Sequence, residues 1–287
     1  MGTASYTIYI NGVEQSPEPL RGGNGLGGPY AWTSMPLKPG SPTSAQRRAI
    51  GALLHDAGAA VHMQYSPTGS GASIFDAAAA FVSPFQYSNA IISYNGGTDL
   101  PAGKRDIMIN SNLHARYPVL LGIRGEGGGM GHAILCDGYG YQSGTIYHHL
   151  NMGWNGADDA WYNLPNVDTD APYTSVDCLV YNIYKSGTGE IIAGRVLDDS
   201  GHAIQGATVT ATRNGSSFTR TDTTNVKGIF ALARVPSGSA YNVRVTKAGY
   251  TFTDRTARTG TSASPGTGIP TGTCGNVWNF NFRGTPQ

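Results

Sequence analysis

The sequence predicts an α+β domain with an antiparallel sheet, followed by an all-β sandwich. Helix-like segments occur between about residues 43 and 116, and most strand-like runs follow from residue 119. After a short glycine-containing linker at 185–189, only short alternating runs and turn residues remain. A chain of 287 residues, 39% of them hydrophobic, is long enough for two cores. We therefore expect domains at 1–185 and 186–287.

The first forty residues predict strands and a loop. The run from Tyr6 to Ile10 alternates and meets Asn11-Gly12, a pair typical of two-residue hairpin turns. Residues 21–29 contain too much glycine for regular structure and predict a surface loop.

Three helices should follow. Thr43 or Ser44 can cap the first, and Gly58 is available for the left-handed position after its last turn. An alanine-rich helix is expected at 73–83 and a third around 106–116, because each segment ends just before a proline.

Glycine-rich turns separate the predicted strands. In the first domain these strands are 119–123, 132–136, 147–150 and 178–183. In the second domain they are 191–197, 207–212, 218–223, 229–232, 241–246 and 277–282. Residues 262–272 are low in complexity and are expected to form an exposed loop.

Composition narrows the functional class. Charged residues make up only 13% of the chain, the net charge is +1 and no Lys/Arg block occurs, so no nucleic-acid partner is expected. No apolar run approaches the ~18 residues of a membrane span. A surface rich in hydroxyls and amides suggests a secreted or cell-envelope protein. The residues after Met1 lack a secretory signal, so we expect the chain to begin inside a longer precursor.

The three cysteines are Cys136, Cys178 and Cys274. Their odd number and wide spacing offer neither a disulfide framework nor a metal-binding pair, so buried free thiols are expected. Neither a metal nor a cofactor is predicted for this chain.

The sharpest local feature is the segment GGMGHAILCDG at 128–138, followed by YHHLNMGWNG at 147–156. A glycine run that ends in His132 lets the backbone approach a ligand closely and places an imidazole at the start of a strand. Imidazole is suited to proton transfer near neutral pH.

These two segments resemble the histidine region of the streptopain cysteine peptidases, a papain-like family. The similarity extends over about 155 residues, from residue 30 to about 185, and includes YAWTSMP at 30–36, VHMQY at 61–65 and GSGAS at 69–73. It implies a papain-like partial catalytic domain in which His132 is the general base, Asn151 a candidate orienter of its ring and Trp154 a candidate wall of the site.

Two departures from the family pattern affect this interpretation. The tryptophan that follows the family's asparagine is Met152 here. The family's nucleophile lies in a Thr-Gly-Cys-type segment upstream of the region that matches this chain, and no such motif occurs in the sequence. Cys136 shares a strand face with His132, but four strand residues span ~13 Å, far beyond the ~3 Å that a nucleophile and its base require.

Other polar residues have simpler interpretations. His148 and His149 are adjacent on a predicted strand, so they should point to opposite faces and not share an ion. Asp137, Asp158 and Asp159 are interpreted as turn or solvent-facing residues. The segment from 194 to 250 resembles carboxypeptidase-regulatory-like, transthyretin-type sandwiches, which implies a non-catalytic accessory domain.

Two functions remain open. The first is a cysteine-type endopeptidase that is inactive as this chain because the nucleophile's segment is absent; its partners would be a polypeptide substrate and a separate Cys-bearing segment, with self-association through the uncovered face. The alternative is a non-catalytic extracellular protein that binds peptides or glycans on a peptidase scaffold.

Overall fold

The computed structural model describes residues 4–38, 40–128, 131–262 and 274–287. They form two compact units, Met1–Tyr87 and Ser88–Gln287, each considered by itself below. The predicted loop at 263–272 and Gly129-Met130 of the glycine run lie outside the described residues. Within the described residues, no helix combines the length and apolarity needed to cross a bilayer.

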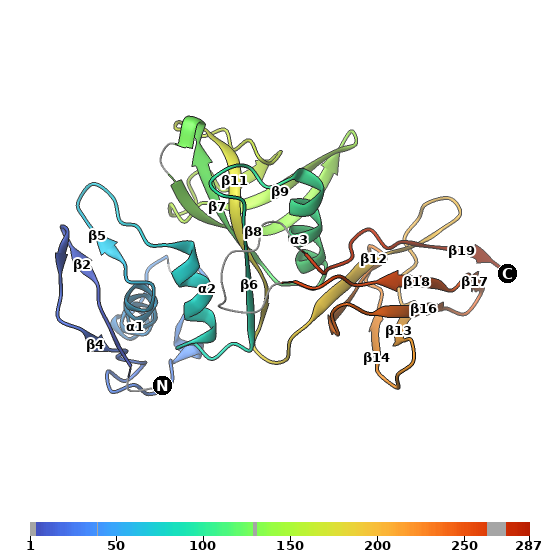
Figure 1. Cartoon of the computed structure of the whole chain (residues 1–287), viewed down its shortest axis with the longest axis horizontal. Helices are drawn as coiled ribbons and strands as arrows, with labels where there is room; N and C mark the ends of the chain where they lie inside the picture. Colours follow the sequence, from blue (N-terminus) through green and yellow to red (C-terminus); the bar gives the residue numbers. More distant parts are fainter. Residues whose placement is uncertain (1–3, 39, 129–130, 263–273) are drawn as a thin grey trace. The chain divides into compact units, whose positions relative to one another are not determined.

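The first unit contains short strands and two helices (Figure 1). Its strands are β1 (Ser5–Tyr6), which pairs with β4 (Glu18–Pro19), and the sheet formed by β2 (Tyr9–Ile10), β3 (Val13–Glu14) and β5 (Gln64–Tyr65). Asn11 and Gly12 have φ values of 51° and 77°, as the turn of a tight hairpin requires, so the predicted hairpin is confirmed.

Helix α1 (Ser44–Ala60) begins with a capping box in which Thr43 accepts from the Gln46 amide and the Gln46 side chain accepts from Thr43 N. The predicted end of this helix at Gly58 is wrong, because Gly58 lies inside the helix. A Cβ there would overlap the Tyr65 hydroxyl, so glycine is needed for close packing. Helix α2 (Ile74–Val82), capped by Ser73, confirms the second predicted helix.

Asp56 on α1 anchors the predicted glycine-rich loop. Its carboxylate is fully buried and accepts hydrogen bonds from Arg21 N (2.9 Å), Gly22 N (2.7 Å) and the Tyr30 hydroxyl (2.6 Å). His55 Nδ1 lies 3.1 Å from the same carboxylate. The loop is therefore held at both of its ends by one side chain.

The second unit opens with an antiparallel sheet of six strands in the order β10-β9-β8-β7-β11-β6. Their bounds are β6 (Asn89–Tyr94), β7 (Val119–Gly125), β8 (Gly131–Gln142), β9 (Thr145–Asn151), β10 (Ala160–Tyr162) and β11 (Tyr173–Tyr184). Helix α3 (Ala102–His114) contributes Met108 and Ile109 to the core beside Ile123, Ile134 and Leu150. The core thus lies between α3 and one face of the sheet.

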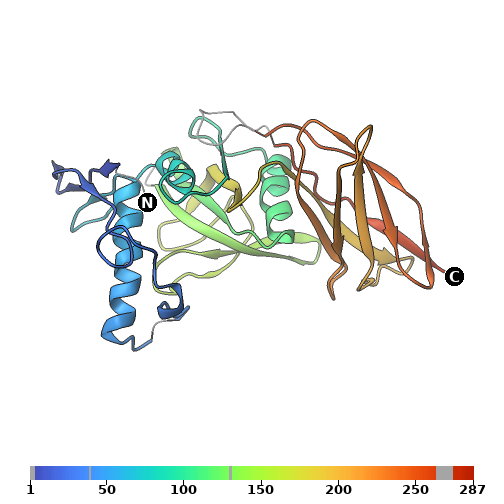
Figure 2. The same cartoon turned by 90° about the horizontal axis from the view of Figure 1, so that it is seen from below.

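The remaining strands form two four-stranded sheets, β15-β12-β19-β17 and β14-β13-β16-β18, which face each other (Figure 2). They are β12 (Glu190–Asp198), β13 (Thr208–Arg213), β14 (Thr219–Thr223), β15 (Ile229–Val235), β16 (Ala240–Thr246), β17 (Tyr250–Phe252), β18 (Arg255–Arg258) and β19 (Phe282–Pro286). The strand predicted at 277–282 begins later: Val277 forms only an isolated bridge with Ile192, and the strand itself starts at Phe282.

Helix α3 lies between the six-stranded sheet and the sandwich, and contacts β8 on one side and β12 on the other (Figure 2). A buried amide network joins the same parts. Asn276 of the sandwich donates to Ser111 Oγ on α3 (2.8 Å) and to Asn182 Oδ1 on β11 (2.9 Å), and its own Oδ1 accepts from Ile191 N (2.9 Å). The domain boundary predicted at 185/186 therefore falls within this compact unit.

Gly194 on β12 offers a local stability test. A Cβ there would overlap the Phe280 carbonyl, which belongs to the backbone and cannot rotate away. We expect Gly194→Ala to lower the free energy of unfolding by about 1–3 kcal/mol in urea denaturation. Gly103→Ala, at the start of α3 in the same unit, is the control, because no atom lies within 4 Å of its Cβ position and its φ is not in the left-handed region. Equal losses in both variants would contradict the overlap.

Candidate active site

His132 occupies the second position of β8 and pairs with Ile123 of β7. It shares the inward face with Ile134 and Cys136, both buried in the core. The imidazole itself is only partly buried. The strand pattern thus places His132 at the rim of the core, where its ring can reach both protein and solvent.

A backbone carbonyl orients the imidazole. Nε2 of His132 lies 2.8 Å from the carbonyl oxygen of Met152. Because a carbonyl can only accept, Nε2 carries the proton in the neutral ring and Nδ1 carries the lone pair that a general base uses. Met152 is itself fully buried, and its amide donates to Asp159 Oδ1 at 2.8 Å. The Asp159 carboxylate therefore holds the Met152 backbone in place, and the Met152 carbonyl in turn orients the His132 ring.

Two aromatic rings lie nearly parallel to the imidazole. The Trp154 ring centroid is 4.9 Å from that of His132 at an interplanar angle of 23°, and the Tyr173 ring is 6.2 Å away at 26°. Trp154 is 39% exposed, whereas Tyr173 is buried. The structure thus brings His132 and Trp154 together, as expected for a wall beside the imidazole.

Asn151 makes a different contact. Its side-chain oxygen accepts from the amide of Gly153 at 2.9 Å, within the turn that carries Met152. The residue is exposed, and it is the Met152 carbonyl that accepts the hydrogen bond from the imidazole. In this structure Asn151 shapes the turn, and the ring is oriented by the backbone next to it.

None of the three cysteine thiols is suited to act as the nucleophile of this site. Burial raises the pKa of Cys136 and of Cys274 to about 12, and it also raises the pKa of Cys178. Since the thiolate is the nucleophilic form, all three are unreactive near neutral pH. The Cys136 sulfur lies 3.7 Å from the Gly138 carbonyl on its own strand.

The histidine pair on β9 confirms the predicted alternation. His148 is fully buried with Nε2 3.0 Å from Asn110 Oδ1, and burial lowers its pKa to about 4. His149 lies on the opposite face, where Nδ1 is 2.6 Å from Asp137 Oδ1. The described residues contain no group of three His, Cys, Asp or Glu side chains that could hold a metal ion.

The interpretation of the aspartates needs correction at Asp159, which is partly buried and holds the Met152 amide. Asp137 faces solvent, as expected, and also pairs with His149 across a β-bulge. Asp158 has a φ of 58° and is exposed, as a turn residue should be. No sequence signal separates Asp159 from Asp158. Tyr173, 41 residues after the histidine, also carried no signal of its contact with the ring.

His132 therefore lies on an inner strand of the antiparallel sheet, with Nε2 held by the Met152 carbonyl and its ring stacked against Trp154. The solved structure of active wild-type interpain A, a cysteine protease of Prevotella intermedia, is similar to this chain: it is 26% identical, with a TM-score of 0.53 over 63% of this chain and 74% of that chain. The chain belongs to the peptidase C10 family, whose profile matches residues 1–162. Residues 191–267 match the carboxypeptidase regulatory-like domain.

Relatives of known name agree with this assignment. Streptopain of Streptococcus pyogenes serotype M1 is 28% identical over 158 residues, 55% of this chain and 38% of streptopain. The thiol protease/hemagglutinin PrtT of Porphyromonas gingivalis is 31% identical over 140 residues, 48% of this chain and 15% of PrtT. The chain therefore spans well under half the length of the curated relatives that it matches.

Proposed function

We propose that this chain carries the histidine-bearing part of a cysteine endopeptidase, a partial α+β catalytic domain over 1–185 with an accessory sandwich over 186–287. The observation that carries the proposal is the hydrogen bond from His132 Nε2 to the Met152 carbonyl, which leaves Nδ1 to act as the base. The proposal is also supported by the family match, which includes His132, and by the resemblance of its segment to the family's histidine region.

In the proposed reaction Nδ1 of His132 removes the proton of a cysteine thiol, and the thiolate attacks the scissile carbonyl carbon. The resulting imidazolium protonates the departing amine, and the same nitrogen then removes a proton from the water that hydrolyses the thioester. Trp154 shields one face of the ring. The thiol itself belongs to a Cys-bearing segment that this sequence does not include, which together with a polypeptide substrate would be its partner.

The isolated chain is therefore expected not to hydrolyse peptide bonds. The measurement is release of fluorescent peptides from labelled casein in the presence of a reducing thiol. Hydrolysis that an epoxide inhibitor blocks, and that His132→Ala abolishes, would contradict the absence of a nucleophile in this chain.

A test of His132 as the base requires a chain that also contains the nucleophilic cysteine. Joining the part of streptopain that precedes its matched region to residue 1 should give a thiol-dependent peptidase, and His132→Ala in that fusion should abolish activity. His149→Ala is the matched control. Because His149 lies on the opposite face of the sheet, this variant should keep most of the activity. Equal activity in the His132→Ala fusion would refute the assignment.

The alternative, a non-catalytic protein that binds peptides or glycans, is favoured by Met152, where the family has tryptophan. The two functions differ in solution behaviour. A peptidase lacking a segment exposes the apolar surface that the segment covered and should self-associate. A monodisperse monomer in light scattering would favour the binding function. Either function suits a secreted or envelope protein.

A further inference from the structure

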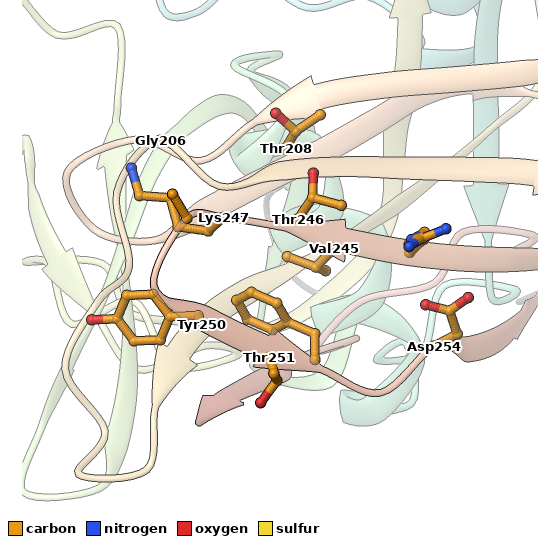
Figure 3. A pocket seen from close by; sticks show the side chains of 11 residues that line it. Gly206, Thr208, Val245, Thr246, Lys247, Tyr250, Thr251 and Asp254 are labelled. Atoms are coloured by element: carbon orange, nitrogen blue, oxygen red, sulfur yellow. The ribbon is translucent and has the colours of Figure 1, made fainter. Parts of the chain in front are cut away.

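The sandwich carries a pocket of about 800 Å³ that the proposed peptidase chemistry does not use (Figure 3). This volume is within the ~300–1,000 Å³ of typical ligand sites. The lining comes from β16, β17, the turn between them and the start of β13. The two strands that flank the pocket belong to different sheets, because β16 pairs with β13 and β17 pairs with β19.

One wall of the pocket is an open strand edge. On one side β16 is paired with β13 as far as Thr246. On the other side β18 ends at Arg255, opposite Val243, and the chain of β17 departs to the second sheet. Among the described residues, no strand is therefore paired with that side of residues 244–246. An extended peptide can satisfy such an edge by adding a strand.

Positive charge collects at this edge. The Lys247 amino group reaches over Gly206 at one end of the pocket (Figure 3), and a Cβ at Gly206 would lie only 3.1 Å from Nζ. Within the described residues, neither Lys247 nor Arg244 has a carboxylate within 4 Å. Asp254 lies at the other end and accepts from Asn242 Nδ2 at 3.3 Å. The end at Lys247 therefore favours an anionic group.

The other wall is apolar. The rings of Tyr250 and Phe252 are 6.2 Å apart at 32°, and both pack partly against the sandwich core. Thr208 and Thr246 also line the pocket and add hydroxyl groups to it (Figure 3). Aromatic surface beside hydroxyl groups suits an uncharged side chain on the strand that enters.

We propose that this pocket binds an extended acidic peptide, which adds a short strand to β16 at 244–246 and places a carboxylate at Lys247. The backbone edge supplies affinity for any extended chain, and the lysine selects for the acidic group. This site is independent of the proposed peptidase activity.

The test uses the full chain and a pool of fluorescein-labelled hexapeptides with four positions randomised among Val, Thr, Ile and Tyr and ending in Glu-Glu. Fluorescence anisotropy should show binding that Lys247→Glu weakens at least about tenfold. Lys227→Glu is the matched control: it makes the same charge change on an exposed turn of the same sandwich, away from the pocket, and should leave binding unchanged.

A second pool with N-methylated backbone amides tests the strand edge, because methylation removes the donors that strand pairing needs; this pool should not bind. Lys247→Gln removes the positive charge without adding a negative one, and it should also weaken binding. Circular dichroism of both Lys247 variants shows whether they are folded. The proposal would be overturned if the acidic pool did not bind, or if the N-methylated pool bound as well as the unmethylated pool. It would also be overturned if the Lys247 variants bound the acidic pool as well as the wild type does. Binding of polygalacturonate in place of either pool would instead make this an anionic-glycan site.

Discussion

Replacing Asn276 with alanine is expected to lower the free energy of unfolding of the second unit by about 2–4 kcal/mol. The change removes the acceptor of Ile191 N and the donor to Ser111 Oγ, and it leaves Asn182 short of one partner. All of these groups are buried, so each unpaired one costs the free energy of its lost hydration.

The measurement is urea unfolding followed by hydrogen exchange and mass spectrometry, which reports α3 and β12 separately. In the wild type both should lose protection together, and in the variant β12 and the rest of the sandwich should detach from α3 first. Asn214→Ala is the control, because Asn214 is exposed on a turn of the same sandwich and should change stability by less than ~0.5 kcal/mol. An equal loss in both variants would show that the amide network does not join the two parts.

Removal of the Asp56 carboxylate should have an effect of similar or larger size on the first unit. In Asp56→Ala the amides of Arg21 and Gly22 and the hydroxyl of Tyr30 lose a buried acceptor. We expect a loss of about 3–5 kcal/mol and fast amide exchange over residues 21–30. Glu14→Ala, on an exposed strand residue of the same unit, should be nearly neutral. Unchanged exchange in the loop would contradict the anchoring role.

The same carboxylate predicts an acid dependence. Burial by itself raises the pKa of Asp56, but the hydrogen bonds from Tyr30, His55 and the two amides outweigh burial, and the pKa is lowered overall. A lowered folded-state pKa stabilises the fold above the unfolded value of ~3.9, and this contribution is lost as the pH falls through the folded-state pKa. Stability of the first unit should thus decline below about pH 4, and Asp56→Asn should remove that part of the decline.

Sequence patterns predicted most of the elements because local chemistry decides them. The Asn11-Gly12 turn and the helix stop before Pro84 follow from backbone preferences of one or two residues. Gly58 was misread because its small size serves contact with Tyr65 and not a helix end. Strand β6 was missed because five of its six residues are buried, so its sequence NAIISY lacks the apolar and polar alternation of a half-buried strand.

The residues of the candidate site likewise fall into those that the sequence indicated and those that only the fold brings together. The glycine run indicated His132, and the resemblance to the streptopain family indicated Trp154; the structure stacks the two rings. The hydrogen bond from His132 to Met152 could not be predicted from the sequence, because any residue offers a backbone carbonyl and only the fold decides which one faces the ring. Tyr173 reaches the site through the pairing of β11 with β7, and Asp159 lies just before β10; no local pattern encodes either position.

The position of α3 has a consequence for processing of the chain. Residues 185–189 link β11 to β12 and are mostly exposed, so a protease can cut them. Such a nick would not free the sandwich, because Asn276 would still bind Ser111 on α3, and Ile191 and Ala193 would still pack against Tyr184 of β11. The product would be a nicked complex that migrates as one species in gel filtration and as two bands after denaturation.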